Sequence, residues 1–178
     1  RDYLNRSVDM EPSFWNDCAL QLLEGLAQLS AKEIVHCDLK PENILVQTDR
    51  SSGEITFKIA DLGTARFYGC DRNRSSSCSG SPGYLAPESF AGQPGFESDL
   101  YSLGVILYEL ATGKRPFAGT VKELARAHSY QTPDFKSIHR SEIRPFLAGL
   151  LQKKPNERFR SAKEAVLALH RTLYRKET

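Results

Sequence analysis

Four polar residues within the first 61 positions have the types and spacing needed for phosphate chemistry. Asp38, Lys40 and Asn43 fall in the segment HCDLKPEN, residues 36–43, and Asp61 opens the tripeptide DLG. Transfer of a phosphoryl group requires a carboxylate that takes the hydroxyl proton, a cation beside the phosphate and oxygen ligands for Mg²⁺. The four side chains include each of these groups, so we expect them to share one site.

Two short apolar runs must carry these loops toward each other. Ile44–Val46 follows the first loop, Ile55–Ile59 precedes the second, and residues 49–53 between them are rich in Asp, Ser and Gly. Apolar runs joined by a polar turn predict a β-hairpin. Because the two strands of a hairpin return the chain to its starting point, we expect Asn43 and Asp61 to lie side by side.

Most of the remaining chain predicts helices. Apolar residues recur every three or four positions in residues 12–33, which indicates a long amphipathic helix. Residues 98–113 predict a buried central helix, because they are almost continuously apolar, with Ser98 and Asp99 as candidate N-caps and Gly113 at the end. Three further amphipathic helices are predicted, at Val121–His128, Ser141–Gln152 and Ser161–Tyr174. The expected fold is mainly α with a small β-hairpin region.

The composition is that of an ordinary globular protein. The chain has 178 residues, of which 40% are hydrophobic and 26% charged, and its formal charge of +2 gives no reason to expect nucleic acid or a membrane as the main partner. No apolar run approaches the length that spans a bilayer. The four cysteines lack the CxxC and zinc-type spacings, which suits reduced thiols, so a cytoplasmic, intracellular protein is expected.

The two polar segments together resemble the catalytic loop and the metal-binding loop of eukaryotic-type protein kinases. In that family Asp38 would be the catalytic base, and Lys40 would contact the γ-phosphate of ATP. Asn43 and Asp61 would hold Mg²⁺ or Mn²⁺, and Leu45 would form the floor of the adenine site. The resemblance therefore implies phosphorylation of a protein substrate, with ATP and Mg²⁺ as cofactors.

Residues 61–88 resemble the activation segment of the family, which ends in the motif APE. In its last part, GSPGYLAPE, Ser81 would link Asp38 and Lys40 by hydrogen bonds. Gly83 would belong to the surface that receives the substrate.

Other positions resemble the structural supports of the family. Glu88 would pair with Arg158, which lies in the segment PNERF, and Asp99 would accept hydrogen bonds from the backbone of the catalytic loop. His36 would pack against Leu62, which replaces the usual phenylalanine, in a hydrophobic column beneath the site. These residues are expected to hold the loops in place rather than to react.

The lysine two residues after the catalytic aspartate is typical of serine/threonine kinases, since tyrosine kinases usually have a different sequence there, with arginine further along. The stretch GSPGYLAPE agrees with this assignment. The resemblance thus implies a protein partner with a serine or threonine acceptor.

Cys37 stands where the family usually has an arginine that holds an activation-loop phosphate. We therefore expect activity to be independent of phosphorylation at the four serines Ser75, Ser76, Ser77 and Ser79. Cys37 itself is either a reactive thiol or, in the favoured interpretation, a small buried side chain. Cys70 and Cys78, in the same loop, form either a disulfide or free thiols, and free thiols are favoured.

Three features of the N-terminal lobe of the family do not occur in the sequence: a glycine-rich loop, a strand lysine and its helix glutamate. The whole chain, 1–178, is therefore expected to be the C-terminal lobe of a two-lobed α+β domain. Its missing N-lobe would be a necessary partner, without which the chain is inactive. Two alternatives are a pseudokinase or scaffolding module and a kinase of small molecules. The intact reacting residues argue against the first, and the APE segment argues against the second.

Overall fold

The computed structural model of the chain describes residues 11–69 and 80–174. Its fold is mainly helical, with two small antiparallel sheets of two strands each. Along the chain the elements are α1 (Pro12–Ala31), β1 (Ile34–Val35), the 3₁₀ turn η2 (Pro41–Asn43), β2 (Ile44–Thr48), β3 (Ile55–Ile59), β4 (Arg66–Phe67), α2 (Pro87–Phe90), α3 (Phe96–Thr112), α4 (Val121–Tyr130), η3 (Phe135–Ser137), η4 (Ser141–Ile143), α5 (Arg144–Leu150), η5 (Pro155–Glu157) and α6 (Ala162–Leu173).

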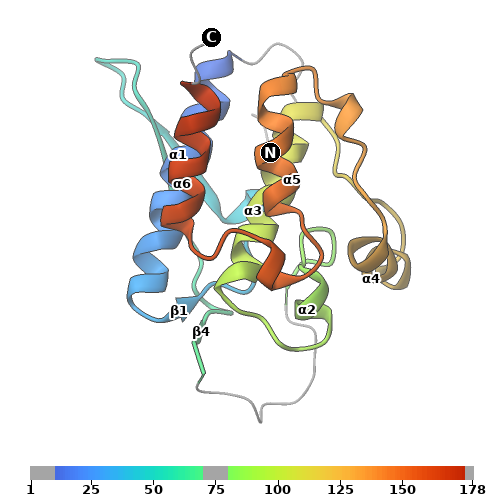
Figure 1. Cartoon of the computed structure of the whole chain (residues 1–178). Coiled ribbons are helices and arrows are strands. Elements are labelled where there is room, and N and C mark those ends of the chain that lie inside the picture. Colours follow the sequence, from blue (N-terminus) through green and yellow to red (C-terminus); the bar gives the residue numbers. More distant parts are fainter. Residues whose placement is uncertain (1–10, 70–79, 175–178) are drawn as a thin grey trace.

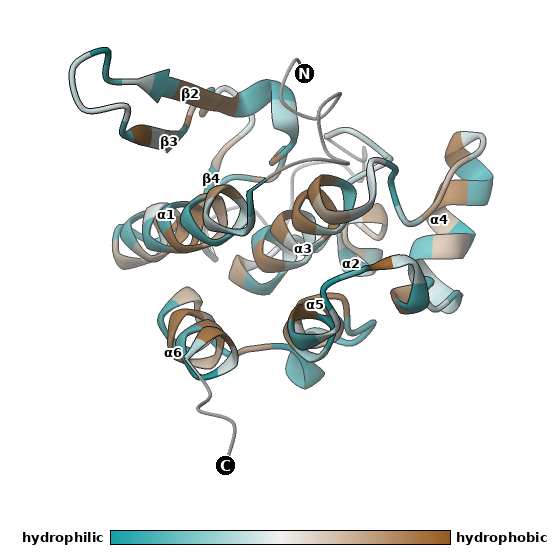
Figure 2. Ribbon diagram, turned by 90° about the horizontal axis from the view of Figure 1, so that it is seen from above, coloured by the Kyte–Doolittle hydropathy of each residue, from teal (hydrophilic) through white to brown (hydrophobic). Residues whose placement is uncertain are grey.

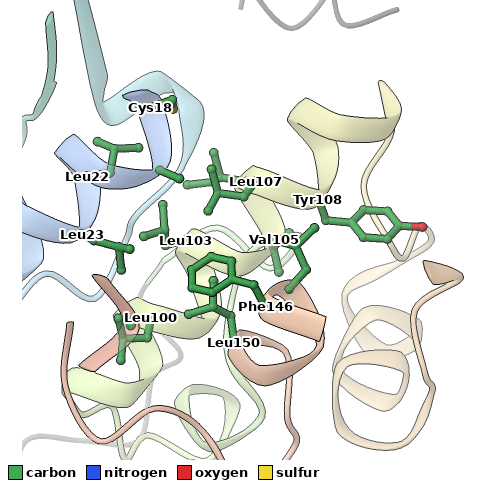
Figure 3. Packing of buried hydrophobic residues seen from close by; sticks show 14 of the residues in the cluster. Cys18, Leu22, Leu23, Leu100, Leu103, Val105, Leu107, Tyr108, Phe146 and Leu150 are labelled. Atoms are coloured by element: carbon green, nitrogen blue, oxygen red, sulfur yellow. The ribbon is translucent and has the colours of Figure 1, made fainter. Parts of the chain in front are cut away.

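Four helices build the core of the molecule. Helix α1 packs against α6 and α3, and α3 packs against α5 (Figure 1). Seen from above, the apolar faces of these helices turn toward one another (Figure 2). Figure 3 shows Leu23 of α1, Leu103 of α3 and Phe146 of α5 gathered in this core, and all three side chains are buried. Among the described residues, no helix is long and apolar enough to cross a membrane.

Helix α3 is the central element, as predicted, because every residue from Ser98 to Tyr108 is buried. A Cβ on Gly104 would lie 2.8 Å from the Cβ of Leu150, so glycine lets α3 and α5 approach this closely. The helix begins two residues earlier than predicted, with Gly95 as its N-cap, and ends at Gly113, whose φ of 74° is left-handed.

The two predicted N-caps of α3 have other roles. Ser98 lies inside the first turn, where its Oγ accepts a hydrogen bond from the backbone N–H of Gly95 at 2.9 Å. The Asp99 side chain points away from its own helix and binds the backbone of a distant loop. The prediction of these caps was wrong because the helix begins at Phe96, which places both residues in its first turn. Their side chains also bind distant partners, Ser98 the carboxylate of Glu88 and Asp99 the backbone of residues 36 and 37.

The predicted helix at residues 141–152 is interrupted. Residues 141–143 form the 3₁₀ turn η4, and α5 begins at Arg144 with Pro145 in its first turn. Proline has no N–H and restricts the residue before it, so it is tolerated at the start of a helix and disfavoured within one. The pairing of β1 with β4 was not predicted, because strands of two residues have no detectable period.

The β2–β3 hairpin lies against α1. Its register pairs Ile44 with Ile59, and its turn projects away from the helices (Figure 1). Gln21 of α1 fixes the hairpin, because its amide donates to the carbonyl of Ile55 at 3.1 Å and accepts from the N–H of Phe57 at 2.8 Å. The strands are therefore held at a set distance from the helical core.

Helix α4 stands apart from the main core and is attached by a small apolar cluster of Phe117, Leu124 and Ala127. His128 of the same helix is fully buried beside it, with its Nδ1 2.9 Å from the hydroxyl of Tyr101. Within the described ranges, Nε2 of His128 has no hydrogen-bond partner.

The imidazole of His128 is therefore held neutral. Burial, and then the charge of Lys153, lower the pKa of His128 from 6.5 to about 4, and the charge of Arg115 acts in the same direction. The polar backbone of Gly83 acts in the opposite direction and raises the pKa of His128, but its effect is smaller than that of burial. Because the unfolded chain takes up the proton at a higher pH than the folded chain, the free energy of unfolding must fall as the pH drops from 6.5 toward 4.

We expect His128→Gln to flatten this pH dependence. Between pH 6.5 and 4 the parent chain should lose up to about 1.4 kcal/mol per pH unit through this histidine, and the variant should not. Urea unfolding followed by the fluorescence of Trp15, the one tryptophan of the chain, measures the slope.

The quantity to compare is the slope of the free energy of unfolding against pH in the parent and in the variant. Burial raises the pKa of Asp99 to about 6, which adds a dependence of opposite sign in the same pH range and cancels in the comparison. His170→Gln, on the exposed surface of α6, is the matched control and should keep the parental slope. Equal slopes in parent and His128→Gln would show that this histidine does not titrate as described.

Candidate active site

Asp38 lies at the centre of the predicted site. Its Oδ2 accepts a hydrogen bond from Nζ of Lys40 at 2.8 Å, and its Oδ1 accepts one from the backbone N–H of Ser81, also at 2.8 Å. The hydrogen bond with Asp38 raises the pKa of Lys40, so the ammonium stays charged. The three residues lie together, but the described contacts differ from the expected link through Ser81. Ser81 contacts Asp38 through its backbone, and Lys40 reaches Asp38 directly.

The hairpin places Asn43 beside the end of β3. The N–H of Ala60 donates to the carbonyl of Asn43 at 2.8 Å, and Asp61 follows directly. The amide Nδ2 of Asn43 donates to the carbonyl of Asp38 at 2.9 Å, which leaves the side-chain oxygen of Asn43 as an acceptor. The two loops that were predicted to meet do so at this point.

An exposed carboxylate and an amide oxygen are ligands that suit Mg²⁺. Asp61 is exposed and has a left-handed φ of 60°, and its Oδ1 accepts a hydrogen bond from the N–H of Gly63 at 3.1 Å. Within residues 11–69 and 80–174 no group of three or more His, Cys, Asp or Glu side chains could hold a metal ion. A divalent cation here would therefore need Asn43, Asp61 and oxygens from a bound phosphate, which is how Mg²⁺ is often held.

Asp99 anchors the loop that carries Asp38. Its carboxylate accepts hydrogen bonds from the backbone N–H groups of His36, at 2.7 Å, and of Cys37, at 3.1 Å. Cys37 has a left-handed φ of 68°, a conformation that strains a residue with a side chain unless the surroundings hold it. The two hydrogen bonds stabilise this turn and so fix the direction of the next residue, Asp38.

His36 joins the two loops from below. It is fully buried, and its Nε2 lies 3.0 Å from the carbonyl oxygen of Ala60, next to Asp61. Thr64 donates from its hydroxyl to the carbonyl of His36 at 3.3 Å. Leu62 is 48% exposed, and its packing against His36 stays a prediction. The contact between the loops is made by hydrogen bonds of His36.

The thiol of Cys37 is suited to packing rather than to reaction. The side chain is buried, and its Sγ donates to the carbonyl of Val35 at 3.5 Å. Burial, and then the Asp99 carboxylate, raise the pKa of Cys37 to about 12. A thiol with such a pKa is not a nucleophile near neutral pH, which agrees with the favoured interpretation of the sequence.

A buried ion pair holds Glu88, at the end of the segment 80–88. Arg158 binds both carboxylate oxygens of Glu88, with Nη1–Oε1 at 2.6 Å and Nη2–Oε2 at 2.8 Å, as predicted. The remaining donors of the guanidinium bind the backbone carbonyls of Gln152, Glu97 and Lys153. All five N–H groups of Arg158 are therefore satisfied, although the side chain has no exposed surface.

Several contacts at the site were not predicted. The hydroxyl of Tyr84 donates to Oε2 of Glu109 at 2.7 Å, and the guanidinium of Arg115 lies over the Tyr84 ring, 5.8 Å from its centre. Arg158 also lies over the ring of Tyr101, at 4.8 Å. These partners are far apart in the sequence, and no spacing rule would have paired them.

The remaining predicted residues lie at the surface, in a groove or outside the described part of the chain. Leu45 is 59% exposed, so it is available to contact a ligand or another segment. Gly83 lines a groove next to Ser81. The predictions for Ser75, Ser76, Ser77 and Ser79, and those for Cys70 and Cys78, lie outside the described residues.

The sequence matches a known family over most of its length. The model of the protein kinase domain matches residues 1–168. The chain is similar to serine/threonine-protein kinase 17A of Oryctolagus cuniculus, with 34% identity over 145 residues, which is 78% of this chain and 36% of that protein. It is similar to serine/threonine-protein kinase unc-51 of Caenorhabditis elegans, with 32% identity over 167 residues, or 88% of this chain and 19% of that protein.

A third relative is serine/threonine-protein kinase TIO of Arabidopsis thaliana, with 39% identity over 145 residues, which is 79% of this chain and 10% of that protein. The chain thus spans about a third or less of the length of these relatives. The match to the kinase domain and the names of the relatives agree with the resemblance seen in the two loops. The chain therefore belongs to the protein kinase family, and the relatives to which it is similar are serine/threonine-protein kinases.

Proposed function

We propose that this chain provides the part of a serine/threonine-protein kinase that positions the protein substrate and the metal ion. The observation that carries the proposal is the position of the Asp38 carboxylate, which lies between the N–H of Ser81 and the ammonium of Lys40. Each carboxylate oxygen can accept a second hydrogen bond, so a substrate hydroxyl can still donate to Asp38.

In this proposal Asp38 orients the serine or threonine hydroxyl and takes its proton as the oxygen attacks the γ-phosphorus of ATP. The bond from the γ-phosphorus to the β,γ-bridging oxygen breaks in the same transfer, and ADP leaves. Lys40 places a positive charge beside the phosphoryl group that moves. Asn43 and Asp61 would hold Mg²⁺. When bound, Mg²⁺ neutralises negative charge on the phosphates. Leu45, exposed on β2, would lie under the adenine ring.

The remaining predicted residues would act as supports. Asp99 and His36 would keep the catalytic loop in place, and Glu88 with Arg158 would hold the end of the activation segment. Their hydrogen bonds support this assignment. Asp99 connects the catalytic loop to helix α3, His36 connects the two loops to each other, and Arg158 holds Glu88 of α2.

We further propose that this chain is the C-terminal lobe of the catalytic domain, with residues 61–88 as its activation segment. The 178 residues include no glycine-rich loop with a following strand lysine, which cover and anchor the phosphates in this family. Positioning supplies most of the catalysis in phosphoryl transfer, so the chain alone should be inactive. A location in the cytoplasm stays a prediction from the cysteine pattern.

The proposed function is tested with the full-length protein that contains this chain. With [γ-³²P]ATP and Mg²⁺, it should label peptides that have serine or threonine at a central position and should not label the matched tyrosine peptide. Asp61→Asn should raise the Mg²⁺ concentration needed for half-maximal rate by on the order of 10-fold or more, since even indirect contacts to a metal contribute this much to affinity.

Asp17→Asn is the matched control, because Asp17 is an exposed aspartate of α1 and this exchange makes the same change of charge. It should leave the Mg²⁺ requirement unchanged. Label on tyrosine alone would overturn the proposed acceptor. No label on any peptide would favour the scaffolding alternative.

A further inference from the structure

A groove of about 920 Å³ begins at the catalytic loop and ends at the start of α4. Its lining includes Lys40 and Asn43 at one end, the segment 81–84 along one side, and Arg115. The groove therefore passes directly beside Asp38, which is bonded to both Lys40 and Ser81. If Asp38 receives the substrate hydroxyl, as proposed above, this groove is the surface beside it along which we expect the flanking residues of the substrate to lie.

Arg115 occupies the space that a side chain at position 83 would fill. A Cβ built on Gly83 would overlap Nη1 of Arg115 and would lie 3.0 Å from its Cζ. The guanidinium also lies over the ring of Tyr84, which keeps it directed toward the substrate segment. Glycine at position 83 thus lets an arginine from a different part of the chain form this wall of the groove.

Two other charged side chains of the groove, unlike Arg115, are already bound to partners within the chain. Lys40 pairs with Asp38 at 2.8 Å, and Glu109 accepts the hydroxyl of Tyr84 at 2.7 Å. Arg115 is exposed and, in the part of the chain that the structure describes, has neither a hydrogen bond nor an ion pair. Its fork of N–H donors matches the two oxygens of a carboxylate. Glu42 also lines the groove, and its negative charge would favour a basic side chain of the substrate rather than an acidic one.

The distance from the reacting group limits where such a carboxylate can be. Ser81 is hydrogen-bonded to Asp38, and a hydrogen bond from the N–H of Tyr84 to the carbonyl of Ser81 closes a turn that contains Gly83. Because the turn keeps Gly83 close to Ser81, the guanidinium lies at roughly 10 Å from the Asp38 carboxylate. An extended peptide covers that distance in about three residues.

We propose that Arg115 is a specificity-determining residue, which pairs with an aspartate or glutamate side chain of the protein substrate within about three positions of the phosphorylated hydroxyl. The proposal rests on the proposed function and deepens it. It assigns a substrate class, acidic around the acceptor, to a residue that takes no part in the chemical step.

The test uses the full-length protein and a series of serine peptides that differ only in one residue. Aspartate, asparagine or lysine is placed in turn at each of the three positions before and after the serine, and kcat/KM is measured for each. At one position or more the parent should prefer aspartate over asparagine by about 3- to 10-fold, the range for a two-point contact of arginine with a partly exposed carboxylate.

Three variants assign the preference to Arg115. Arg115→Ala should abolish it, Arg115→Lys should restore part of it, and Arg115→Glu should replace it by a preference for lysine. Gly83→Ala should weaken the preference while leaving the charge in place, because a Cβ there displaces the guanidinium. Lys114→Ala is the matched control, since Lys114 is the exposed neighbour that does not line the groove, and it should keep the preference.

The proposal is overturned if the parent shows no preference for aspartate at any position or prefers lysine, or if Arg115→Ala keeps the parental ratio. These outcomes leave the proposed function intact, because all of them require transfer to serine. Absence of transfer to every peptide, asparagine peptides included, would instead overturn the proposed function and this proposal with it.

Discussion

Replacing Asp38 by asparagine should lower kcat of the full-length protein by about 10²- to 10⁴-fold, the usual contribution of a positioned general base. The reason is the geometry around the carboxylate. Its two oxygens accept from Ser81 and Lys40, and both contacts hold the side chain without using its capacity for a second hydrogen bond. An amide has one acceptor oxygen, cannot take the hydroxyl proton, and would turn an N–H toward one of these two donors.

The effect should appear in kcat rather than in KM for ATP, because in the proposed function Asp38 faces the substrate hydroxyl. Asp17→Asn, with the same change of charge on the exposed surface of α1, should leave kcat at the parental value. If both variants lost activity equally, the loss would be due to charge or folding and not to the position of Asp38.

Arg158→Met should lower the free energy of unfolding by about 3–5 kcal/mol, the range measured when one partner of a buried ion pair is removed. The arginine has no exposed surface, and the Glu88 side chain that pairs with it is 14% exposed. Methionine would leave that carboxylate without its bidentate partner. It would also leave the carbonyls of Gln152, Glu97 and Lys153 without the donors that the guanidinium provides.

Urea unfolding followed by Trp15 fluorescence measures this change. Lys154→Met is the matched control, because Lys154 forms a 2.8 Å ion pair with Glu157 whose side chains are 72% and 46% exposed. Surface pairs of this kind contribute little, so the control should unfold at the parental urea concentration. Equal shifts of the urea midpoint in both variants would mean that the buried pair of Arg158 and Glu88 stabilises the fold no more than a surface pair does.

Local sequence signals predicted the elements that bring the site together. The polar turn between two apolar runs predicted the hairpin, and the observed register, Ile44 with Ile59, places Asn43 next to the residue before Asp61. The apolar stretch before Gly113 predicted the central helix. These signals are reliable because turn residues and hydrophobic periodicity act over a few positions.

Tertiary contacts account for what the sequence did not reveal. Asp99 has the type and place of a helix cap, yet its carboxylate binds the backbone of residues 36 and 37, which are more than 60 positions away. Arg115 is one charged residue in a loop until the fold brings it against Gly83. Pro145 is a different case, since its effect on the helix start is local and the break before α5 could have been predicted from it.

The resemblance to protein kinases supplied the roles of the site residues, and the fold adds the contacts that make those roles physically reasonable. The pair of Glu88 and Arg158 was expected from the family, whereas the three carbonyls that complete the arginine were not. The hydrogen bonds of His36 that connect the two loops were likewise not part of the family-based expectation.

A single-turnover experiment tests the central claim most directly. Full-length protein is saturated with [γ-³²P]ATP and Mg²⁺, mixed with a serine peptide, and quenched over time, while ATP binding is measured in parallel for the parent and for Asp38→Asn. The account predicts label on serine for the parent and a rate about 10²- to 10⁴-fold lower for the variant, with ATP affinity unchanged. Equal rates for the two proteins, or no label from either, would contradict it.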